Sequence, residues 1–458
     1  MNPIQIVVAG ASGYIGREII PRLLKKFPEA KVTALSRSGL PFPDARVECK
    51  SCDLFSLKSL EQAMPHHVDL ALYLVHSMGP TAQLDQGNFA DYDLILADNF
   101  ARAVKSRGVK QLIYLGGIIP ESTTLSLHLQ SRLEVEDAFR HHAIPTTAFR
   151  AGLILGEAGS STQILLKLVK RLPVMICPRW TQTRTAPVDL ETVLTSLAEA
   201  SLNQNCYGKI YDLAGCQPLT YLEMMRETAR FLGKKRYFFT VPFFTPTLSR
   251  LWVSLITNTP KDLVYPLIES LEHPMVPAKD RYFSKDWLNR TYFDLLPKVS
   301  FKVHARKNLF RFRPSGKTVR SVQRLPLPSG QNAQWVKERY LDWLPKFVWP
   351  LIRVTTSGDV ARLSLRFWHE PLLVLEFSKE RSQPDRQVLY IKGGLLVARK
   401  GGGRLEFRVV LNRKFVLAAI HEYQPSLPWF IYKYTQAKVH LLTMRAFGQN
   451  LARFSEKG

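Results

Sequence analysis

The chain has 458 residues, 46% of them hydrophobic, with 25 Gly and 29 Pro. This composition excludes a disordered or fibrous protein and predicts two or three globular domains. Residues 1–280 hold 30 Lys and Arg against 26 Asp and Glu, a net charge of +4, whereas residues 281–458 hold 33 against 12, a net charge of +21. The carboxyl-terminal part is therefore expected to attract an anionic partner.

Five cysteines, an odd number, do not indicate a disulfide framework, and the first residues lack the order of a signal peptide. The most apolar region, 237–260, is interrupted by Pro242, Pro246 and Arg250, so we expect no membrane-spanning helix. The predicted setting is the cytoplasm, either free or peripheral to the inner membrane face. Cys49 and Cys52 have the spacing of half a zinc site but no second pair, which favours a structural role and predicts no metal site.

Strands and helices alternate through the first third of the chain. Strands are expected at residues 4–9, 31–36, 70–75, 111–115 and 146–150, and helices at 14–27, 92–106 and 133–142. This order predicts a doubly wound parallel sheet, an α/β Rossmann fold, covered by helices on both faces. From about residue 158 longer helices and Pro-rich connections predict a substrate cap, mainly over 158–294.

A glycine run joins the first strand to the first helix. It reads Gly10-Ala11-Ser12-Gly13-Tyr14-Ile15-Gly16, between a buried strand and an amphipathic helix. Glycines allow a tight turn and the close approach of backbone to a diphosphate, which then lies on the unpaired N–H groups of the helix. We therefore predict a dinucleotide site here.

The end of the second strand is expected to decide which nicotinamide cofactor binds. A carboxylate there would bind the adenosine ribose, but no acid occurs between Glu29 and Asp44. Arg37 stands there between two serines, and a guanidinium suits a ribose 2′-phosphate. This pattern favours NADP over NAD, although a solvated loop arginine would have the same sequence.

The amino-terminal part resembles the NmrA-like, NAD(P)H-binding branch of the atypical short-chain dehydrogenase/reductase family. The resemblance covers roughly residues 4–275 and rests on the glycine run, on Asp53-Leu54, on the segment 74–78 (Leu-Val-His-Ser-Met) and on the segment 149–152 (Phe-Arg-Ala-Gly). It implies that Asp53 holds the adenine, with Leu54 beside it. It also implies that the segment from Val75 to Met78, which includes His76, lines the nicotinamide side.

The catalytic residues depart from that superfamily, whose reductases use a Tyr-x-x-x-Lys pair on one helix face. The matching segment here places His128 and Arg132 at the same spacing. An imidazole is able to donate a proton, and Arg132 supplies a fixed charge but no proton. The pair therefore indicates either a divergent catalytic dyad or a protein that senses NADP(H) without turnover.

Residues 295–337 contain ten Lys and Arg and no acid, and we place a basic linker at 295–330 and thus a first domain at 1–294. The stretch Lys298–Arg324, with its interleaved phenylalanines, suits a solvated linker, an anionic membrane contact or, less favoured, nucleic-acid binding. The aromatic cluster near Tyr237–Phe239 is expected to pack the cap or line an apolar channel.

Residues 331–458 are expected to form an α+β domain. Strands are predicted at 352–356, 361–367, 372–377, 388–391, 395–400, 405–411 and 415–421, followed by one helix over 429–454. The part from 295 on is similar to a domain of unknown function fused to such reductases, and this implies a helix-grip, START-like fold with a hydrophobic ligand. The whole chain is predicted to transfer hydride between NADPH and an apolar carbonyl, quinone or enone, or else to be the catalytically silent NADP(H)-sensing protein. The sequence does not settle the oligomeric state.

Overall fold

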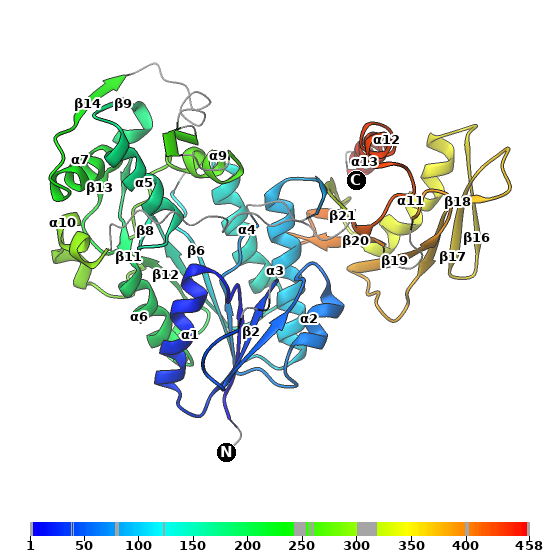
Figure 1. Ribbon diagram of the computed structural model, residues 1–458. Helices are drawn as coiled ribbons and strands as arrows, with labels where there is room; N and C mark the ends of the chain where they lie inside the picture. Colours follow the sequence, from blue (N-terminus) through cyan, green and yellow to red (C-terminus); the bar gives the residue numbers. More distant parts are fainter. Residues whose placement is uncertain are drawn as a thin grey trace. The chain divides into compact units, whose positions relative to one another are not determined.

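Seven strands of the amino-terminal part form one parallel sheet in the computed structural model (Figure 1). Their order is β12 (Ile210–Leu213), β7 (Thr146–Ala151), β6 (Gln111–Gly117), β4 (Leu70–Tyr73), β1 (Gln5–Ala9), β2 (Lys31–Ser36) and β3 (Val47–Ser51). The structure describes residues 3–37, 39, 41–77, 82–121, 124–241, 253–254, 256–257, 261–299, 318–398 and 403–455. The strand order reverses between β1 and β4, so the predicted doubly wound Rossmann architecture is confirmed.

Helices cover both faces of this sheet. On one face, α1 (Tyr14–Lys26) and α6 (Leu190–Ala200) pack against each other and against Leu70 and Leu72 of β4. On the other, α3 (Phe89–Ser106) and α4 (Leu127–His141) bring Phe100 and Phe139 onto Tyr73, with ring centroids 5.2 Å and 5.1 Å away. Because alternate strand residues face opposite ways, the apolar strands are buried on both sides.

A smaller core lies between residues 155 and 299, in the region expected to form the cap. It is built from α5 (Ser160–Arg171), α7 (Tyr221–Phe231), α10 (Tyr292–Leu295) and a two-stranded parallel ribbon of β9 (Val174–Pro178) and β14 (Tyr237–Val241). A further helix, α9 (Lys261–Ser270), lies in the same region. Of the predicted aromatic cluster, Phe238 packs into this core, whereas Tyr237 and Phe239 are exposed.

The chain divides into two units, one of residues 1–78 and 93–307 and one of residues 79–92 and 308–458. The second unit contains an eight-stranded sheet whose pairs are antiparallel except for the last. Its order is β16 (Ile352–Ser357), β17 (Val360–Leu365), β18 (Pro371–Phe377), β19 (Arg386–Gly393), β20 (Arg404–Val410), β21 (Phe415–Tyr423), β15 (Val319–Pro326) and β5 (Leu84–Gln86). The edge strand β5 comes from the amino-terminal part of the sequence and pairs in parallel with β15.

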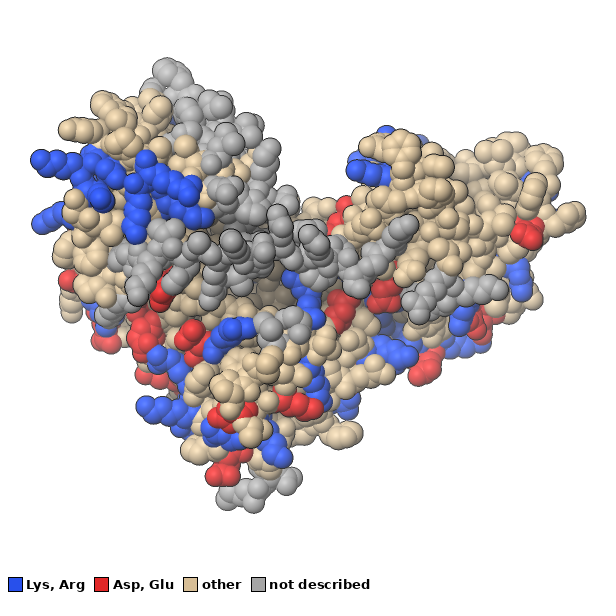
Figure 2. Space-filling model, in the orientation of Figure 1, with Lys and Arg blue, Asp and Glu red and all other residues tan. Residues whose placement is uncertain are grey.

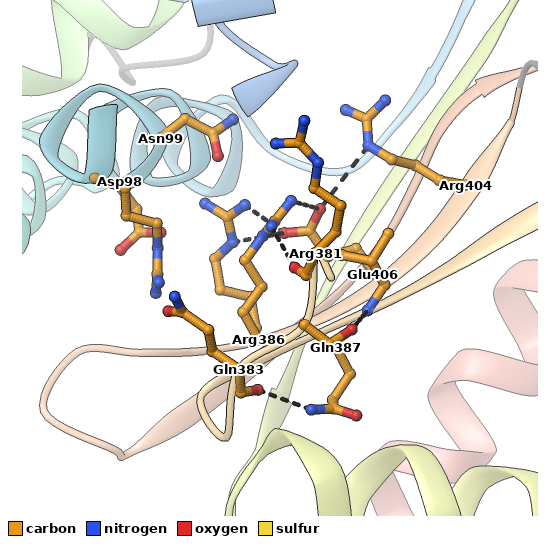
Figure 3. A network of polar contacts seen from close by, with 12 residues as sticks. Asp98, Asn99, Arg381, Gln383, Arg386, Gln387, Arg404 and Glu406 are labelled. Atoms are coloured by element: carbon orange, nitrogen blue, oxygen red, sulfur yellow. Dashed lines mark hydrogen bonds and ion pairs between the residues drawn. The ribbon is translucent and has the colours of Figure 1, made fainter. Parts of the chain in front are cut away.

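Two helices, α11 (Ala333–Phe347) and α13 (Gln436–Ser455), share a core with this sheet, and the short α12 (Trp429–Tyr434) precedes α13. Along β20, Leu405 and Phe407 belong to that core, so Arg404, Glu406 and Arg408 lie on the opposite face. Figure 3 shows Arg386 and Arg404 directed at Glu406. The predicted α+β class is confirmed for this unit, and the START-like relationship stays a prediction.

Several predicted elements differ from the structure. The strand expected at 395–400 is wrong for residues 395–398, where the amides of Leu396 and Ala398 donate one hydrogen bond each, to the carbonyl oxygens of Leu372 and Gln424. Residues 399 and 400 lie outside the described residues. The helix expected over 429–454 breaks at Thr435, and the helix expected at 133–142 begins at Leu127. The predicted linker, 295–330, contains β15, while most of its basic stretch lies outside the described residues. Within the described ranges, we find no helix long and apolar enough to cross a bilayer.

Candidate nucleotide and redox site

The glycine run forms the turn between β1 and α1. Gly10 has a left-handed backbone, with φ of 84°, and a Cβ there would lie 2.8 Å from the carbonyl oxygen of Leu74. A Cβ on Gly16 would lie 2.4 Å from the carbonyl oxygen of Gly10. Glycine is therefore required at both positions, as the motif predicts.

Helix α1 begins at Tyr14 with its amide groups uncapped. Gly13, at the cap position, offers no side-chain acceptor, and the first turn contains no acid. The first helical bond runs from the amide of Arg17 to the oxygen of Gly13, which leaves the amides of residues 14–16 directed out of the helix end. Ser12 is half-buried beside this end. This geometry suits an anionic diphosphate.

The hydroxyl of Tyr14 points toward a neighbouring loop rather than into the turn. A Cβ on Gly156 would lie 2.6 Å from that hydroxyl, and the backbone of residues 157 and 158 hydrogen-bonds to it. Burial is the main reason that the pKa of Tyr14 is raised. Ile15, by contrast, packs against the sheet core. Both side chains thus fix α1 in place and leave the cofactor contacts to the backbone.

Arg37 directly follows β2, and Asp53 follows β3. Partial desolvation lowers the pKa of Arg37, and the carboxylate of Asp53 raises it, so the two side chains interact. Asp53 also accepts the amide of Phe55 at 3.0 Å, which fixes the carboxylate in the loop. Leu54 is buried, and its carbonyl oxygen accepts a hydrogen bond from Asn99 at 2.8 Å. In the sheet, Arg37 thus follows the strand next to β1, and Asp53 follows the strand after that.

A buried carboxylate, Asp93 of α3, joins the segment after β4 to helix α4. Its oxygens accept hydrogen bonds from the amide of Ser77 at 2.7 Å, from the hydroxyl of Ser131 at 3.1 Å and from Nη2 of Arg132 at 3.1 Å. Nδ1 of His76 lies 2.9 Å from the same carboxylate. Burial raises the pKa of Asp93 to about 7, and the bonds from Ser77 and Ser131 lower it. The fixed charge of Arg132 favours the ionised carboxylate.

The predicted pair His128 and Arg132 lies in this cluster, together with His76. The rings of His76 and His128 are 5.1 Å apart, and Arg132 also contacts Nδ1 of His76. Burial lowers the pKa of His128 to about 4, so that its imidazole is neutral at neutral pH. Burial lowers the pKa of Arg132 to about 10, which still leaves it charged. His76, which the family resemblance placed on the nicotinamide side, is the histidine of this cluster that contacts the Asp93 carboxylate.

The cluster is adjacent to the glycine turn through the segment after β4. A Cβ on Gly10 would lie 3.4 Å from Cγ2 of Val75, the residue before His76. In a parallel sheet the carboxyl ends of all strands lie at one edge, and here that edge carries the ends of β1 to β4. The glycine turn, Arg37, Asp53 and His76 thus follow four neighbouring strands at the point where the strand order reverses.

Sequence reasoning missed Asp93 and Ser131 as members of the site, while Ser77 lies in the segment that the resemblance placed on the nicotinamide side. Asp93 had a detectable signal, because it is an acid on the helix face that also carries Ala97 and Phe100, both fully buried. A carboxylate on an apolar stripe requires partners. Arg150, part of the motif that carried the family resemblance, instead makes a bidentate pair with Glu136 at 3.0 Å and 3.1 Å.

The cysteine pair does not form a disulfide: Cys49 and Cys52 are both free thiols. Burial raises the pKa of Cys52, the opposite of what a reactive thiolate requires. This environment agrees with the structural role expected for the pair.

A family model for the NAD dependent epimerase/dehydratase family matches residues 6–126. Auxiliary protein GraX of Staphylococcus aureus is 29% identical over 133 residues, which are 27% of this chain and 40% of that protein. The chain therefore spans about two fifths of the length of this curated relative. The residues matched by the family model include the glycine turn.

Solved structures of reductases and epimerases resemble the fold. A nucleoside-diphosphate-sugar epimerase from Staphylococcus aureus has a TM-score of 0.51 at 15% identity and covers 64% of this chain and 99% of its own. Citrobacter sp. triphenylmethane reductase complexed with NADP(H) and Escherichia coli NADPH-dependent quinone oxidoreductase complexed with NADPH each have a TM-score of 0.49, at 19% and 17% identity, with the same coverage. The likeness to the Staphylococcus aureus epimerase agrees with the Rossmann-type strand order of the parallel sheet.

Proposed function

We propose that the chain is an NADP(H)-dependent oxidoreductase that transfers hydride between NADPH and an apolar carbonyl, quinone or enone. The observation that carries the proposal is the His76–Asp93–Arg132 cluster at the end of β4, directly beside the glycine turn at the end of β1. An anion site at a glycine turn and a charged proton-transfer group at one sheet edge are what such a reaction needs.

The backbone amides at the start of α1 would hold the diphosphate, and Arg37 would hold the ribose 2′-phosphate. Asp53 would contact the adenosine end, as the family resemblance implies. When bound, NADPH supplies the hydride that is added to the carbonyl carbon. Val75 and His76 would then lie at the nicotinamide end, because they follow β4 next to Gly10.

His76 is the proton donor in this proposal, in place of His128. In the imidazolium form its Nδ1–H would donate to Asp93, 2.9 Å away, and its Nε2 is the atom that would give a proton to the substrate oxygen as the hydride arrives at carbon. Asp93 stabilises the imidazolium, while Ser77 and Ser131 hold the carboxylate in place. A neutral His128 packs against the ring of His76.

The first test compares NADPH with NADH by calorimetric titration of the wild type and of Arg37→Ala. We expect the wild type to prefer NADPH, and we expect Arg37→Ala to lose roughly tenfold or more in NADPH affinity with NADH unchanged, the loss typical of a charge-assisted hydrogen bond. Equal affinity of the wild type for both cofactors would refute the role of Arg37, and no binding of either would refute the proposal.

The second test follows NADPH oxidation across a panel of quinones, enones and apolar carbonyls. His76→Gln should lower kcat about a hundredfold with NADPH affinity unchanged, which is the contribution of a positioned general acid. His66→Gln, at an exposed position, is the matched control and should leave kcat unchanged. Tight NADPH binding with no oxidation of any substrate would instead identify a protein that senses the cofactor without turnover.

A further inference from the structure

The parallel ribbon of β9 and β14 has one buried face and one exposed apolar face. Tyr237 pairs with Val174, and Phe239 pairs with Ile176. These four side chains are 63%, 48%, 58% and 43% exposed, respectively. The alternate residues point the other way, since Met175 and Cys177 are each 1% exposed and Phe238 packs into the cap core. The ribbon thus presents a two-by-two apolar patch to solvent, which we call the ribbon patch.

Basic residues gather where both ribbon strands begin. Lys170 and Arg171 end α5 just before β9, and Lys234, Lys235 and Arg236 come just before β14. The two groups lie side by side, because Arg236 donates to the carbonyl oxygens of Val169 at 2.7 Å and Lys170 at 3.0 Å. Figure 2 shows Lys and Arg side chains gathered over α5 and α7 in this region.

The two chain segments that carry these basic residues contain no acidic residues. The sequence has no Asp or Glu between Glu157 and Asp189, nor between Glu227 and Asp262. The ribbon patch and its basic edge therefore come from two segments that lack acids entirely. Such a surface is complementary to an anionic partner that also accepts apolar side chains.

We propose that the ribbon patch and its basic edge dock on an anionic lipid bilayer. Tyr237 and Phe239 would enter the boundary between headgroups and acyl chains, where aromatic side chains are favoured, and the cations would contact the acidic headgroups. Nucleic acid fits less well, because the exposed aliphatic side chains Val174 and Ile176 offer no stacking surface. A second copy of the chain would bring like charges together at the edge of the patch.

This surface is distinct from the basic stretch 298–324, for which the sequence also suggested a membrane contact, and it does not depend on the proposed oxidoreductase activity. The experiment uses the full chain and vesicles of phosphatidylcholine alone or mixed with an equal amount of phosphatidylserine. We expect sedimentation with the mixed vesicles only, weakening as salt is added. The double variant Lys234→Glu/Lys235→Glu should bind at least roughly thirtyfold more weakly, because the loss of two cations facing an anionic surface accounts for about thirtyfold and the two new carboxylates are repelled by that surface.

The control variant Lys58→Glu/Lys105→Glu makes the same charge change at two exposed lysines on α2 (Leu57–Ala63) and α3, and it should bind as the wild type does. A second measurement locates the contact. In a Cys49→Ser background, which removes the half-buried thiol, an environment-sensitive dye on Phe239→Cys should shift to the blue on mixed vesicles, and a dye on Lys58→Cys should not. Equal binding of the two double variants, or an unshifted dye at position 239 on bound protein, would overturn the proposal.

Discussion

Replacing Glu406 by glutamine tests the charge arrangement of the second unit. Glu406 is 2% exposed and accepts Nε and Nη2 of Arg386 at 2.9 Å and 3.1 Å and Nε of Arg408 at 2.7 Å (Figure 3). Glutamine keeps the shape of the side chain but removes the negative charge. The guanidinium groups of Arg386 and Arg408 then lose their shared counter-charge.

Removing one partner of a buried ion pair typically costs about 3 to 5 kcal/mol, because the remaining charge stays desolvated. Since the substituted side chain would retain one carbonyl acceptor, we expect Glu406→Gln to lower the free energy of unfolding by about 3 kcal/mol. Glu376→Gln is the matched control in the same sheet. Its partner Lys392 lies 2.8 Å away, but both side chains are nearly half exposed, so the expected loss is below about 1 kcal/mol.

The assay is urea unfolding followed by tryptophan fluorescence, with hydrogen exchange of β19 and β20 amides to assign the transition to the second unit. The pH dependence gives a further check. Burial alone would raise the pKa of Glu406, but Arg386 and Arg408 hold it well below the usual range. Its stabilisation is therefore complete above about pH 4.5 and is lost as pH falls toward the folded-state pKa. A loss for Glu406→Gln no larger than for Glu376→Gln would refute this reasoning.

Two further predictions concern the first unit. Asp93→Asn should lower kcat at least about tenfold without weakening NADPH binding, because His76 loses its anionic partner. Because the pKa of Asp93 is raised to about 7 and the ionised form is the active one, wild-type activity should rise with pH through about 7, and this limb should be absent in the variant. Gly16→Ala places a Cβ 2.4 Å from the Gly10 oxygen and should cost about 1 to 3 kcal/mol of stability and most NADPH affinity. Gly13→Ala, with a 3.1 Å contact to the same oxygen, should cost less in urea unfolding and in NADPH titration.

The parallel sheet could be predicted from sequence because its signals are local. The strand before Gly10 is an unbroken apolar run, and α1 has its apolar residues at helical spacing. The tight glycine turn adds a second local constraint, because Gly10 and Gly16 admit no side chain. The apolar run, the helical spacing and the glycine spacing can each be read within one strand or one turn, although the atom that excludes a side chain from Gly10 belongs to Leu74.

Elements of the second unit were harder to predict because their order depends on distant pairing. β15 contains two arginines and follows a basic stretch, so it resembles a linker, yet it pairs with β21 along its length. The pairing of β5 with β15 joins residues more than 200 positions apart, and no local pattern contains that information. The segment 395–400 has the apolar composition of a strand. However, the amides of Leu396 and Ala398 donate hydrogen bonds to two different segments, so these residues do not pair continuously with one strand.

The choice between His128 and His76 as the proposed proton donor shows why sequence spacing alone could not identify the donor. The i, i+4 rule placed His128 and Arg132 on one face of α4, and the structure agrees that both lie beside His76. However, spacing along one helix gives no information about burial or about an acid on another helix. Asp93 of α3 lies beside His76, which is why we propose His76 as the proton donor, while burial makes His128 a neutral ring. A kcat that falls with His128→Gln but not with His76→Gln would reverse this assignment while leaving the cofactor site as described.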